Sequence, residues 1–352
     1  MAPAPALDIA AIPSPVLITG GAGFIGRYLA EALARAGKAV TVLDDLSCKN
    51  STFDCPQIRR AQARCVEGSV FDEALMAAEV AAHRTVVHFA SVVGVEETIS
   101  RPFDTIDNLR GTMHLARLLT ADHVALFASS ADVYALHSHM YDRPMREDDL
   151  IVLERPEVNR WVYAHVKALE ENLIANAAAR SVVIRVFNTY GPMMDYPAAK
   201  RVIPHFMANI MAGEPMRLSG DGSQQRSFCY VEDTVGGMML ALAEAAQAAP
   251  DAAKPFAACY NLGASQPMSM RALAEYMNAA AVRLGLIEAP LPIEADAFTY
   301  SQKFDDSWHR VPDIGRARER LGFAPTTAFD VGMERTLAYY RDLARSQAQA
   351  AA

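Results

Sequence analysis

The chain has 352 residues, of which 51% are hydrophobic and 21% are charged, an ordinary composition for a soluble globular protein of one large or two moderate domains. Its 33 Lys and Arg residues against 41 Asp and Glu residues give a net charge of -8, which argues against a general affinity for nucleic acid or an anionic membrane. No apolar run reaches the roughly 18 residues that a membrane-spanning helix needs, so no membrane partner is expected.

The ends of the chain and the cysteines point to no special chemistry. Residues 1–14 are rich in Ala and Pro and lack the basic segment of a signal peptide, so a flexible N-terminus is expected. Residues 344–352 are expected to form a flexible tail. The five cysteines, an odd number without CxxC spacing, indicate reduced thiols in a cytoplasmic protein with no metal site. His137 and His139 stand in a polar stretch and are interpreted as a solvated loop.

A strand, a glycine-rich turn, a helix and a second strand come first along the chain. Val16 to Thr19 is a short apolar run, GGAGFIG follows at once, and residues 27–37 carry apolar side chains at helical spacing. A second β-rich run over residues 39–45 completes the unit. This order is the start of a Rossmann-type, doubly wound parallel sheet, and it predicts an α/β fold.

The same alternation continues along the first half of the chain. Further strands, each interpreted as buried, are expected over residues 63–70, 84–91, 123–130 and 181–188. Helices are expected between them, over residues 72–82, 103–119 and 160–178. After Gly191 and Pro192, prolines punctuate shorter elements. We therefore expect an NAD-binding Rossmann domain over residues 15–190 and a smaller, mixed, mainly substrate-binding domain over residues 191–343, with some elements returning to the Rossmann part.

Gly20, Gly23 and Gly26 form a GxxGxxG turn that suits a dinucleotide. The first glycine permits a tight turn, the second lets the backbone approach a pyrophosphate, and the third lets the helix pack close to the strand. The amides at the helix N-terminus then face the phosphates. Asp44 ends the next strand, where a carboxylate accepts both adenosine ribose hydroxyls and repels a 2′-phosphate, so NAD is favoured over NADP. The alternatives are a flexible turn for the glycines and a strand-end turn residue for Asp44.

Tyr163 and Lys167 are four residues apart on a predicted helix, so their side chains share one face. Tyrosine at its ordinary pKa of about 10 is a poor base, but a neighbouring ammonium and the positive nicotinamide of NAD+ favour the phenolate. Such a tyrosine can take a hydroxyl proton while hydride leaves the same carbon. Ser130, at the end of an earlier strand, offers a hydroxyl to hold the reacting oxygen. The alternatives are an amphipathic helix surface for YxxxK and a strand-end cap for Ser130.

Together these motifs resemble the extended short-chain dehydrogenases/reductases that modify nucleotide sugars. The resemblance is carried by TGGAGFIG, the strand ending in Asp44, HFAS, FASSADVY and YAHVK, and it runs from about residue 15 to about residue 340. It implies an NAD-dependent enzyme with a tightly held NAD, whose contacts also include Phe24, Ile25, Ser69, Val70 and Ala90.

The segment from RVFNTYGPMMD to RSFCYVEDTV resembles bacterial UDP-glucuronate decarboxylases, and DDSWHRVPDI is similar both to those enzymes and to a related oxidative decarboxylase. The resemblance implies a UDP-linked substrate that is contacted by Asn188, Arg201, Val202, Arg226 and Arg310. Guanidinium groups suit this use because their planar fork pairs with phosphate and carboxylate. The alternative for Arg226 and Arg310 is surface ion pairing.

The expected chemistry starts with oxidation of a glucuronate at C4, which makes a ketone β to the C5 carboxylate and so activates loss of CO2. The product is UDP-xylose or a UDP-4-keto-pentose, depending on whether hydride is returned. Asp132, the expected catalytic carboxylate, stands where the decarboxylases have Glu, and Ala131 and Met193 replace their Ser and Arg. These departures keep a UDP-sugar 4-epimerase open as the alternative, with a non-catalytic NAD(H)-binding regulator as a remote third.

The resemblance also implies a homodimer. Helices over residues 104–119 and 160–178 carry apolar faces on which such a dimer is built. The alternative is that these faces belong to the core of one subunit.

Overall fold

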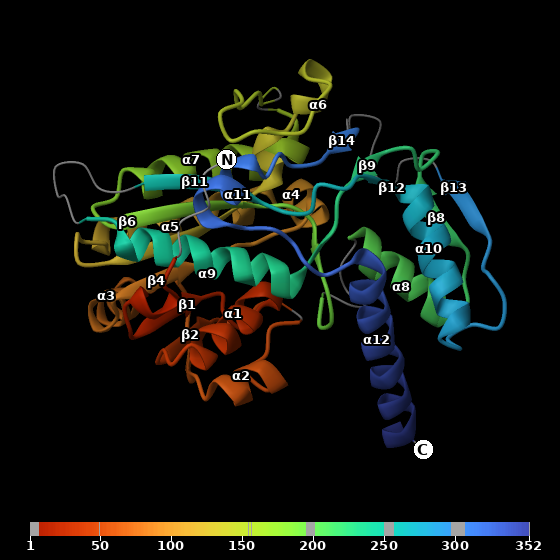
Figure 1. Cartoon of the computed structure of the whole chain (residues 1–352), viewed down its shortest axis with the longest axis horizontal. Helices are drawn as coiled ribbons and strands as arrows, with labels where there is room; N and C mark the ends of the chain where they lie inside the picture. The colour runs from red at the N-terminus through yellow and green to blue at the C-terminus, as the bar shows by residue number, and fades with distance from the viewer. Residues whose placement is uncertain are drawn as a thin grey trace.

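The computed structural model describes residues 7–48, 50–153, 155, 157–194, 201–249, 257–296 and 307–351. Its large sheet contains β1 Val16–Thr19, β2 Val40–Asp44, β3 Arg64–Glu67, β4 Thr85–His88, β5 Val124–Ser130, β6 Arg180–Val186 and β11 Ala257–Leu262. These strands form one seven-stranded parallel sheet in the order β11-β6-β5-β4-β1-β2-β3 (Figure 1). The predicted Rossmann-type α/β fold is confirmed.

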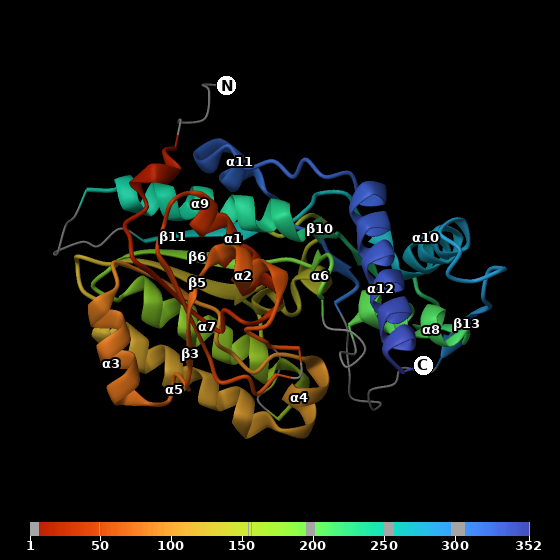
Figure 2. The ribbon, with the colours of Figure 1, turned by 90° about the horizontal axis from the view of Figure 1, so that it is seen from below.

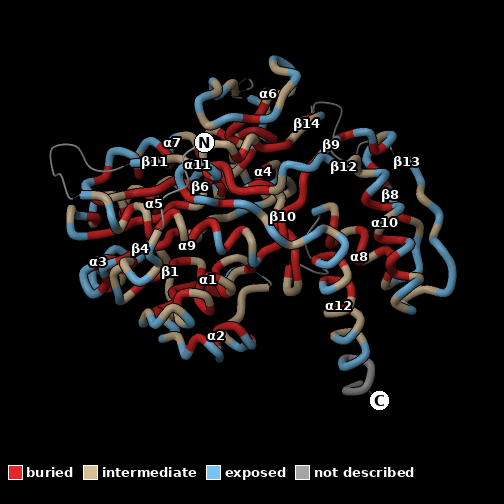
Figure 3. Tube along the Cα trace, in the orientation of Figure 1, coloured by how far each residue is buried: buried red, intermediate tan, exposed pale blue. Residues whose placement is uncertain are grey.

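The central strands are continuous apolar runs because both faces of the sheet are covered. Side chains alternate along a strand, so Val16 and Ile18 of β1 enter the core on one face and Leu17 enters the core on the other. Leu126 and Phe127 of β5 divide between the same two cores. Figure 3 shows these buried strands running through the middle of the molecule.

Helices form a layer on each face of the sheet, as Figure 2 shows. One layer contains α3 Glu73–Ala82, α4 Val95–Ser100, α5 Pro102–Leu118 and α7 Val162–Ala175. The other contains α1 Phe24–Arg35, α2 Pro56–Ala61, α9 Val231–Gln247 and α11 Gly315–Leu321. The helices expected from apolar spacing between the strands are therefore present, and their apolar sides supply the two cores.

The prediction that residues 63–70 form a buried strand is wrong. β3 is the edge strand of the sheet and pairs with β2 on one side. Arg64, Cys65 and Glu67 are exposed, while Val66 is half-buried. An edge strand with charged side chains is typical of natural sheets, because charge discourages pairing with a second molecule.

The chain leaves the large sheet after β6 and builds smaller sheets to one side of it (Figure 1). Their strands are β7 Thr189–Tyr190, β8 Met216–Ser219, β9 Gln225–Arg226, β10 Cys229–Tyr230, β12 Met268–Ser269, β13 Ile293–Asp296 and β14 His309–Arg310. The accompanying helices are α8 Val202–Ala212, α10 Met270–Arg283 and α12 Phe329–Ala351. The helix α9 and the strand β11 return to the large sheet, and the division into two domains near residue 190 stays a prediction.

Both described ends of the chain have helical structure. Ile9–Ala11 form a 3-10 helix, and α12 continues to Ala351, in segments where flexible ends were expected. Residues 1–6 and 352 of those segments lie outside the described residues. Within the ranges that the structure describes, no helix is both long enough and apolar enough to cross a bilayer.

Candidate active site

The turn between β1 and α1 leaves no room for side chains at several glycines. Gly20 has a φ of 67°, and a Cβ there would lie 2.5 Å from the backbone nitrogen of Ala90. A Cβ on Gly26 would lie 2.7 Å from the Cα of Gly21, and one on Gly21 would lie 2.9 Å from a backbone oxygen of β1. Real Cβ atoms do not approach backbone this closely, so the turn requires glycine at all three positions.

The first turn of α1 opens toward the carboxyl edge of the sheet. Gly23 is the residue before the helix, and Phe24, Ile25 and Gly26 are its first three residues. No side chain caps this end of the helix, so its first amides can donate to phosphate oxygens. The backbone cradle and the positive end of the helix dipole together fit the pyrophosphate of NAD.

Asp44 lies beside this cradle at the end of β2. Its Oδ2 accepts a hydrogen bond from the amide of Ala22 at 3.0 Å, and its Oδ1 accepts one from the amide of Leu46 at 2.9 Å. Burial raises the pKa of the Asp44 carboxyl, while these two amide hydrogen bonds lower it. Each carboxylate oxygen retains a further lone pair, which is what ribose hydroxyls would need.

The other predicted cofactor contacts lie along the same edge of the sheet. Ser69 and Val70 follow β3, and Ala90 follows β4, in strands that flank β1 and β2. Val70 packs against α5 so closely that a Cβ on Gly111 would lie 2.8 Å from its Cγ2. Because parallel strands end at one edge, these residues line the edge that the glycine turn occupies.

Tyr163 and Lys167 lie on the first two turns of α7. The Lys167 Nζ is 4.6 Å from the ring centroid of Phe127 in β5 and 5.6 Å from that of Tyr163. Burial raises the pKa of Tyr163, and the Lys167 ammonium opposes this rise. Burial alone would lower the pKa of Lys167, but Glu170 and Tyr163 turn the net shift upward, so the side chain is an ammonium at neutral pH.

Ser130 ends β5, where the chain enters a 3-10 helix over Ala131–Tyr134. The Ser130 Oγ accepts a hydrogen bond from the amide of Asp132 at 3.1 Å and donates one to Asp132 Oδ2 at 3.4 Å. Ser130 therefore caps the 3-10 helix, which is the alternative interpretation of this residue. Its hydroxyl nevertheless lies at the carboxyl edge of the sheet, where a substrate oxygen would be held.

Arginines from three distant segments surround Asp132. Its Oδ1 lies 2.8 Å from an Nη of Arg310 and 3.4 Å from an Nη of Arg160. Arg226 is the register partner of Arg310 in the neighbouring strand, is buried, and donates to the carbonyl of Ser307 at 2.6 Å. Burial raises the pKa of Asp132, but the three guanidinium groups outweigh it and hold the pKa at about 2. Three guanidinium groups brought to one place can also donate to an anionic ligand.

The remaining predicted substrate residues are placed around this arginine cluster in different ways. Asn188 donates from its Nδ2 to the carbonyl of Ser227 at 3.2 Å and so joins the segments before β7 and β10. Arg201 immediately precedes α8, and Val202 is the first residue of that helix. The Arg201 charge lowers the pKa of Tyr163, which shows that it lies within electrostatic reach of the phenol.

Sequence reasoning missed two charged residues of this site, Arg160 and Glu170. Arg160 is three residues before Tyr163, within the 3-10 helix Asn159–Trp161 that leads into α7. Glu170 is three residues after Lys167 and is fully buried. Helical spacing could have indicated Glu170, because positions 163, 167 and 170 share one face. No local signal indicates that Arg160 meets Asp132.

The interpretation of His137 as part of a solvated loop is wrong. His137 begins a short helix, α6 His137–Met140, and is 1% exposed. Its Nε2 lies 2.8 Å from Asp149 Oδ2, and Arg143 pairs with the same carboxylate. The ring of Tyr141 covers the imidazole at a centroid distance of 4.7 Å. Among the residues that the structure describes, no group of His, Cys, Asp or Glu side chains could hold a metal ion.

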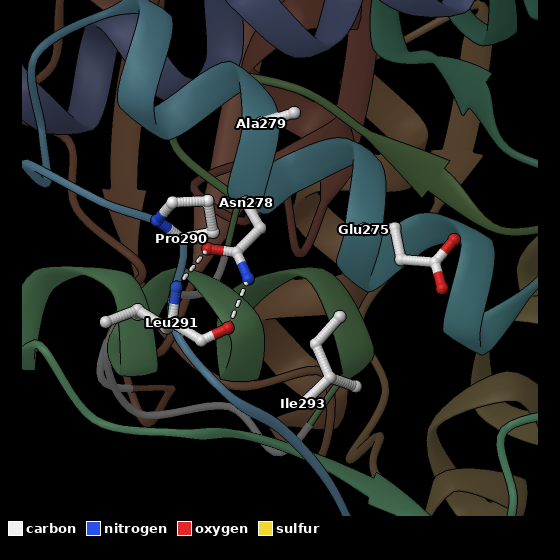
Figure 4. A pocket seen from close by; sticks show the side chains of 6 residues that line it. All are labelled: Glu275, Asn278, Ala279, Pro290, Leu291 and Ile293. Carbon is white, nitrogen blue, oxygen red and sulfur yellow. Dashed lines mark hydrogen bonds between the residues drawn. The ribbon is translucent and has the colours of Figure 1, made fainter.

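An open pocket elsewhere in the molecule contains none of these residues. It lies between α10 and the segment before β13 and is lined by Glu275, Asn278, Ala279, Pro290, Leu291 and Ile293 (Figure 4). Asn278 uses its amide to hold the backbone of Leu291, accepting at 2.8 Å and donating at 2.7 Å. The candidate active site is therefore the sheet edge and the arginine cluster.

A Rossmann sheet, a glycine turn that fits a dinucleotide, and a Tyr–Lys pair on one helix face define a dehydrogenase of the extended short-chain type. The chain belongs to the NAD-dependent epimerase/dehydratase family, whose model matches residues 16–263. It is therefore an NAD-dependent enzyme of that class, as the motifs predicted.

Relatives and solved structures agree with this assignment. The chain is 30% identical to UDP-N-acetyl-alpha-D-glucosaminuronate decarboxylase of Bacillus cytotoxicus, over 93% of this chain and 98% of the relative. It is 28% identical to UDP-glucuronic acid decarboxylase 1 of Arabidopsis thaliana, over 93% of this chain and 70% of the relative. Its fold matches UDP-glucose 4-epimerase of Thermotoga maritima with a TM-score of 0.78 at 22% identity, over 94% of this chain and 99% of the epimerase.

Proposed function

We propose that this enzyme oxidises a UDP-linked uronic acid at C4 and thereby decarboxylates it. The observation that carries the proposal is the convergence of guanidinium groups at the end of β5, where Arg160 and Arg310 pair with the carboxylate of Asp132 and the charge of Arg226 acts on it. Buried guanidinium groups suit the carboxylate and diphosphate of such a substrate. The decarboxylase names of the two relatives support the same substrate class.

In this proposal Tyr163 takes the proton of the C4 hydroxyl, Ser130 holds the same oxygen, and Lys167 steadies the phenolate. NAD, when bound in the glycine cradle beside Asp44, supplies the acceptor and later the donor of a hydride. The C4 ketone is β to the carboxylate, so the bond to CO2 breaks and its electron pair is taken up as an enolate. Protonation of that enolate at C5 completes the decarboxylation.

The substrate anion is proposed to compete with Asp132 for its arginines. Arg310 is paired with Asp132 at 2.8 Å, and its Nε is buried without a hydrogen-bond partner among the described residues. An incoming carboxylate or diphosphate oxygen would satisfy such donors. Asn188, Arg201 and Val202 are proposed to border the nucleotide and diphosphate, in keeping with their positions before β7 and at the start of α8.

A UDP-sugar 4-epimerase is the second candidate. The observation that favours it is the engagement of Asp132 by two arginines, which leaves Tyr163, Lys167 and Ser130 as the groups able to act on a neutral sugar. Epimerisation needs only these groups, NAD and room for the 4-keto sugar to turn over. The fold of a UDP-glucose 4-epimerase is compatible with it but shows no more than the architecture.

The reaction is tested by incubating the NAD-loaded protein with UDP-glucuronate, UDP-N-acetylglucosaminuronate and UDP-glucose in parallel. We expect a uronate to lose the mass of CO2, with NADH absorbance reporting whether hydride is returned. A new stereoisomer of unchanged mass would replace decarboxylation by epimerisation. An absence of change in every nucleotide sugar tried would overturn both proposed reactions.

We also propose that the enzyme is a homodimer in the cytoplasm. Phe103 and Ile106 of α5 are 79% and 44% exposed, and Leu169 of the adjoining α7 is 55% exposed. Such apolar side chains on paired helices suit a two-fold interface. Five free thiols suit a reducing compartment. Sedimentation of the wild-type protein and of Phe103→Glu is expected to show a dimer and a monomer respectively, and a wild-type monomer would overturn the proposal.

A further inference from the structure

A buried polar chain leads from β1 to Lys167, and the proposed chemistry gives it no role. The Thr19 Oγ1 lies 2.7 Å from His88 Nδ1, and His88 Nε2 lies 3.2 Å from Thr112 Oγ1. Thr112 donates to Glu170 Oε1 at 2.5 Å. The other oxygen, Glu170 Oε2, lies 3.0 Å from Lys167 Nζ as an ion pair. The chain thus connects β1, β4, α5 and α7.

The direction of every hydrogen bond in this chain follows from the Glu170 carboxylate at one end and the neutral ring of His88 in the middle. Burial and the Lys167 charge lower the pKa of His88 to about 3, so its ring is neutral and has one donor and one acceptor. Thr112 uses its only proton on the Glu170 carboxylate and must accept from His88 Nε2–H. His88 Nδ1 then accepts the hydroxyl proton of Thr19. All the donors therefore point toward Glu170.

Burying the charged pair of Glu170 and Lys167 costs free energy of desolvation, and this cost calls for an explanation. Its side chain is 0% exposed and that of Lys167 is 3% exposed. Taking a carboxylate and an ammonium out of water costs several kcal/mol per ion, and an apolar pair of similar size is often as stable or more so. A buried pair beside a Tyr–Lys constellation therefore suggests a contribution to function.

We propose that Glu170 is a positioning residue, which holds the Lys167 ammonium and offsets its charge beside Tyr163, while Thr19, His88 and Thr112 hold Glu170 in place. The inference rests on the proposed role of Tyr163 as the base. Glu170 itself touches neither Tyr163 nor the arginine cluster in any contact described above, so it acts on the phenol by its charge and by holding Lys167.

The charges around Tyr163 show what this offset does. Burial is the largest influence and raises the pKa of Tyr163, Lys167 of α7 lowers it, Asp132 and Glu170 raise it further, and Arg201 before α8 lowers it. Lys167 in turn faces Glu170 and Glu171 on its own helix and the neutral ring of His88 on β4. Burial and the two carboxylates outweigh the ammonium, so the pKa of Tyr163 stays above its ordinary value. The phenolate then depends on the positive charge of the oxidised cofactor.

The test titrates Tyr163 directly in the NAD-loaded protein, without any sugar. The tyrosinate absorbance of the wild type minus that of Tyr163→Phe gives the midpoint for this one phenol, and Glu170→Gln is compared with its own Tyr163→Phe partner. Glutamine keeps the volume and the acceptor for Thr112 but removes the charge. We expect the midpoint to fall by about one pH unit, a tenfold change in acidity, because a negative charge near the phenolate is lost.

Two variants keep this test decisive. Glu73→Gln on α3 removes an exposed carboxylate that pairs with His114 of α5, and it is expected to leave the Tyr163 midpoint unchanged. Glu170→Asp keeps the charge, so its midpoint is expected to lie close to that of the wild type. This variant also keeps the proposal testable if circular dichroism shows that Glu170→Gln folds poorly. An unchanged midpoint in Glu170→Gln, or a shift in Glu170→Asp as large as in Glu170→Gln, would overturn the proposal, and a higher midpoint would overturn the charge offset and leave only the holding of Lys167. Because no sugar is present, failure here is distinct from failure of the decarboxylase proposal.

Discussion

The proposed cofactor side and the proposed substrate side of this site are built by different means. The cofactor side is made of backbone: a glycine turn, the first amides of α1, and a strand-end carboxylate whose oxygens bind the amides of Ala22 and Leu46. The proposed substrate side is made of long charged side chains: Arg160 and Arg310 pair with Asp132, and the charge of Arg226 acts on the same carboxylate.

This difference suggests which half can change during evolution. A backbone cradle depends on sterics that any larger side chain violates, so it suits a cofactor that a whole family shares. A cluster of side chains can be altered one residue at a time without moving the sheet.

The largest expected effect lies where the two sides meet, at Tyr163. Tyr163→Phe removes only the hydroxyl, so turnover should fall by about a thousandfold or more while NAD binding is retained. Turnover is measured by product mass and NAD by fluorescence titration. Loss of NAD binding to the same extent as turnover would show that the two sides are not separable at this residue.

The proposed cofactor side, which is built of backbone, is tested most directly by Gly20→Ala. The added Cβ would meet the nitrogen of Ala90 at 2.5 Å in a left-handed conformation, so NAD affinity should fall by about a hundredfold or more. Gly213→Ala is the matched control, because Gly213 has the same φ of 67° with nothing within 4 Å of its Cβ. Equal effects of the two variants on NAD affinity would attribute the loss to general strain and not to the cradle.

The proposed substrate side, which is built of side chains, is tested by Arg310→Ala. Removing a charged hydrogen-bond donor costs about 2 kcal/mol, so KM for a UDP-uronate should rise by about 30-fold while NAD affinity is unchanged. A smaller rise with UDP-glucose would assign Arg310 to the carboxylate, and an equal rise would assign it to the diphosphate. Arg283→Ala, which removes an exposed partner of Glu334, is expected to leave both KM values unchanged.

The smallest expected effect is the pH-dependent contribution of the Asp132 carboxylate to the free energy of unfolding. Its folded pKa of about 2 lies below the ordinary 3.8, so the ionised carboxylate stabilises the fold by about 2 kcal/mol above pH 4. This contribution is lost as the pH falls through about 2. Urea denaturation should therefore show that Asp132→Asn has a lower free energy of unfolding than the wild type at pH 7. The difference between the two proteins should narrow as the pH is lowered. Asp148→Asn, at an exposed carboxylate, should show little gap at either pH.

The cofactor side could be predicted from sequence because its parts are contiguous or periodic. A strand, a glycine turn and a helix follow one another within residues 16–35, and Tyr163 and Lys167 are one helical turn apart. The pairing of Asp132 with Arg160 and Arg310 could not be predicted, because it depends on how β14 and the segment before α7 meet after folding. Burial of His137 was missed for the same reason, since Asp149 and Tyr141 cover a polar stretch only in three dimensions.

The position of β11 has a consequence for how the protein is made. β6 pairs with β11, although β7 to β10, α8 and α9 lie between them in the chain. During synthesis β6 must therefore wait, with one flank of hydrogen-bonding groups unprotected, until translation has passed Leu262. A chain truncated ahead of Ala257 would keep that flank open permanently, and we expect it to be recovered as insoluble aggregate.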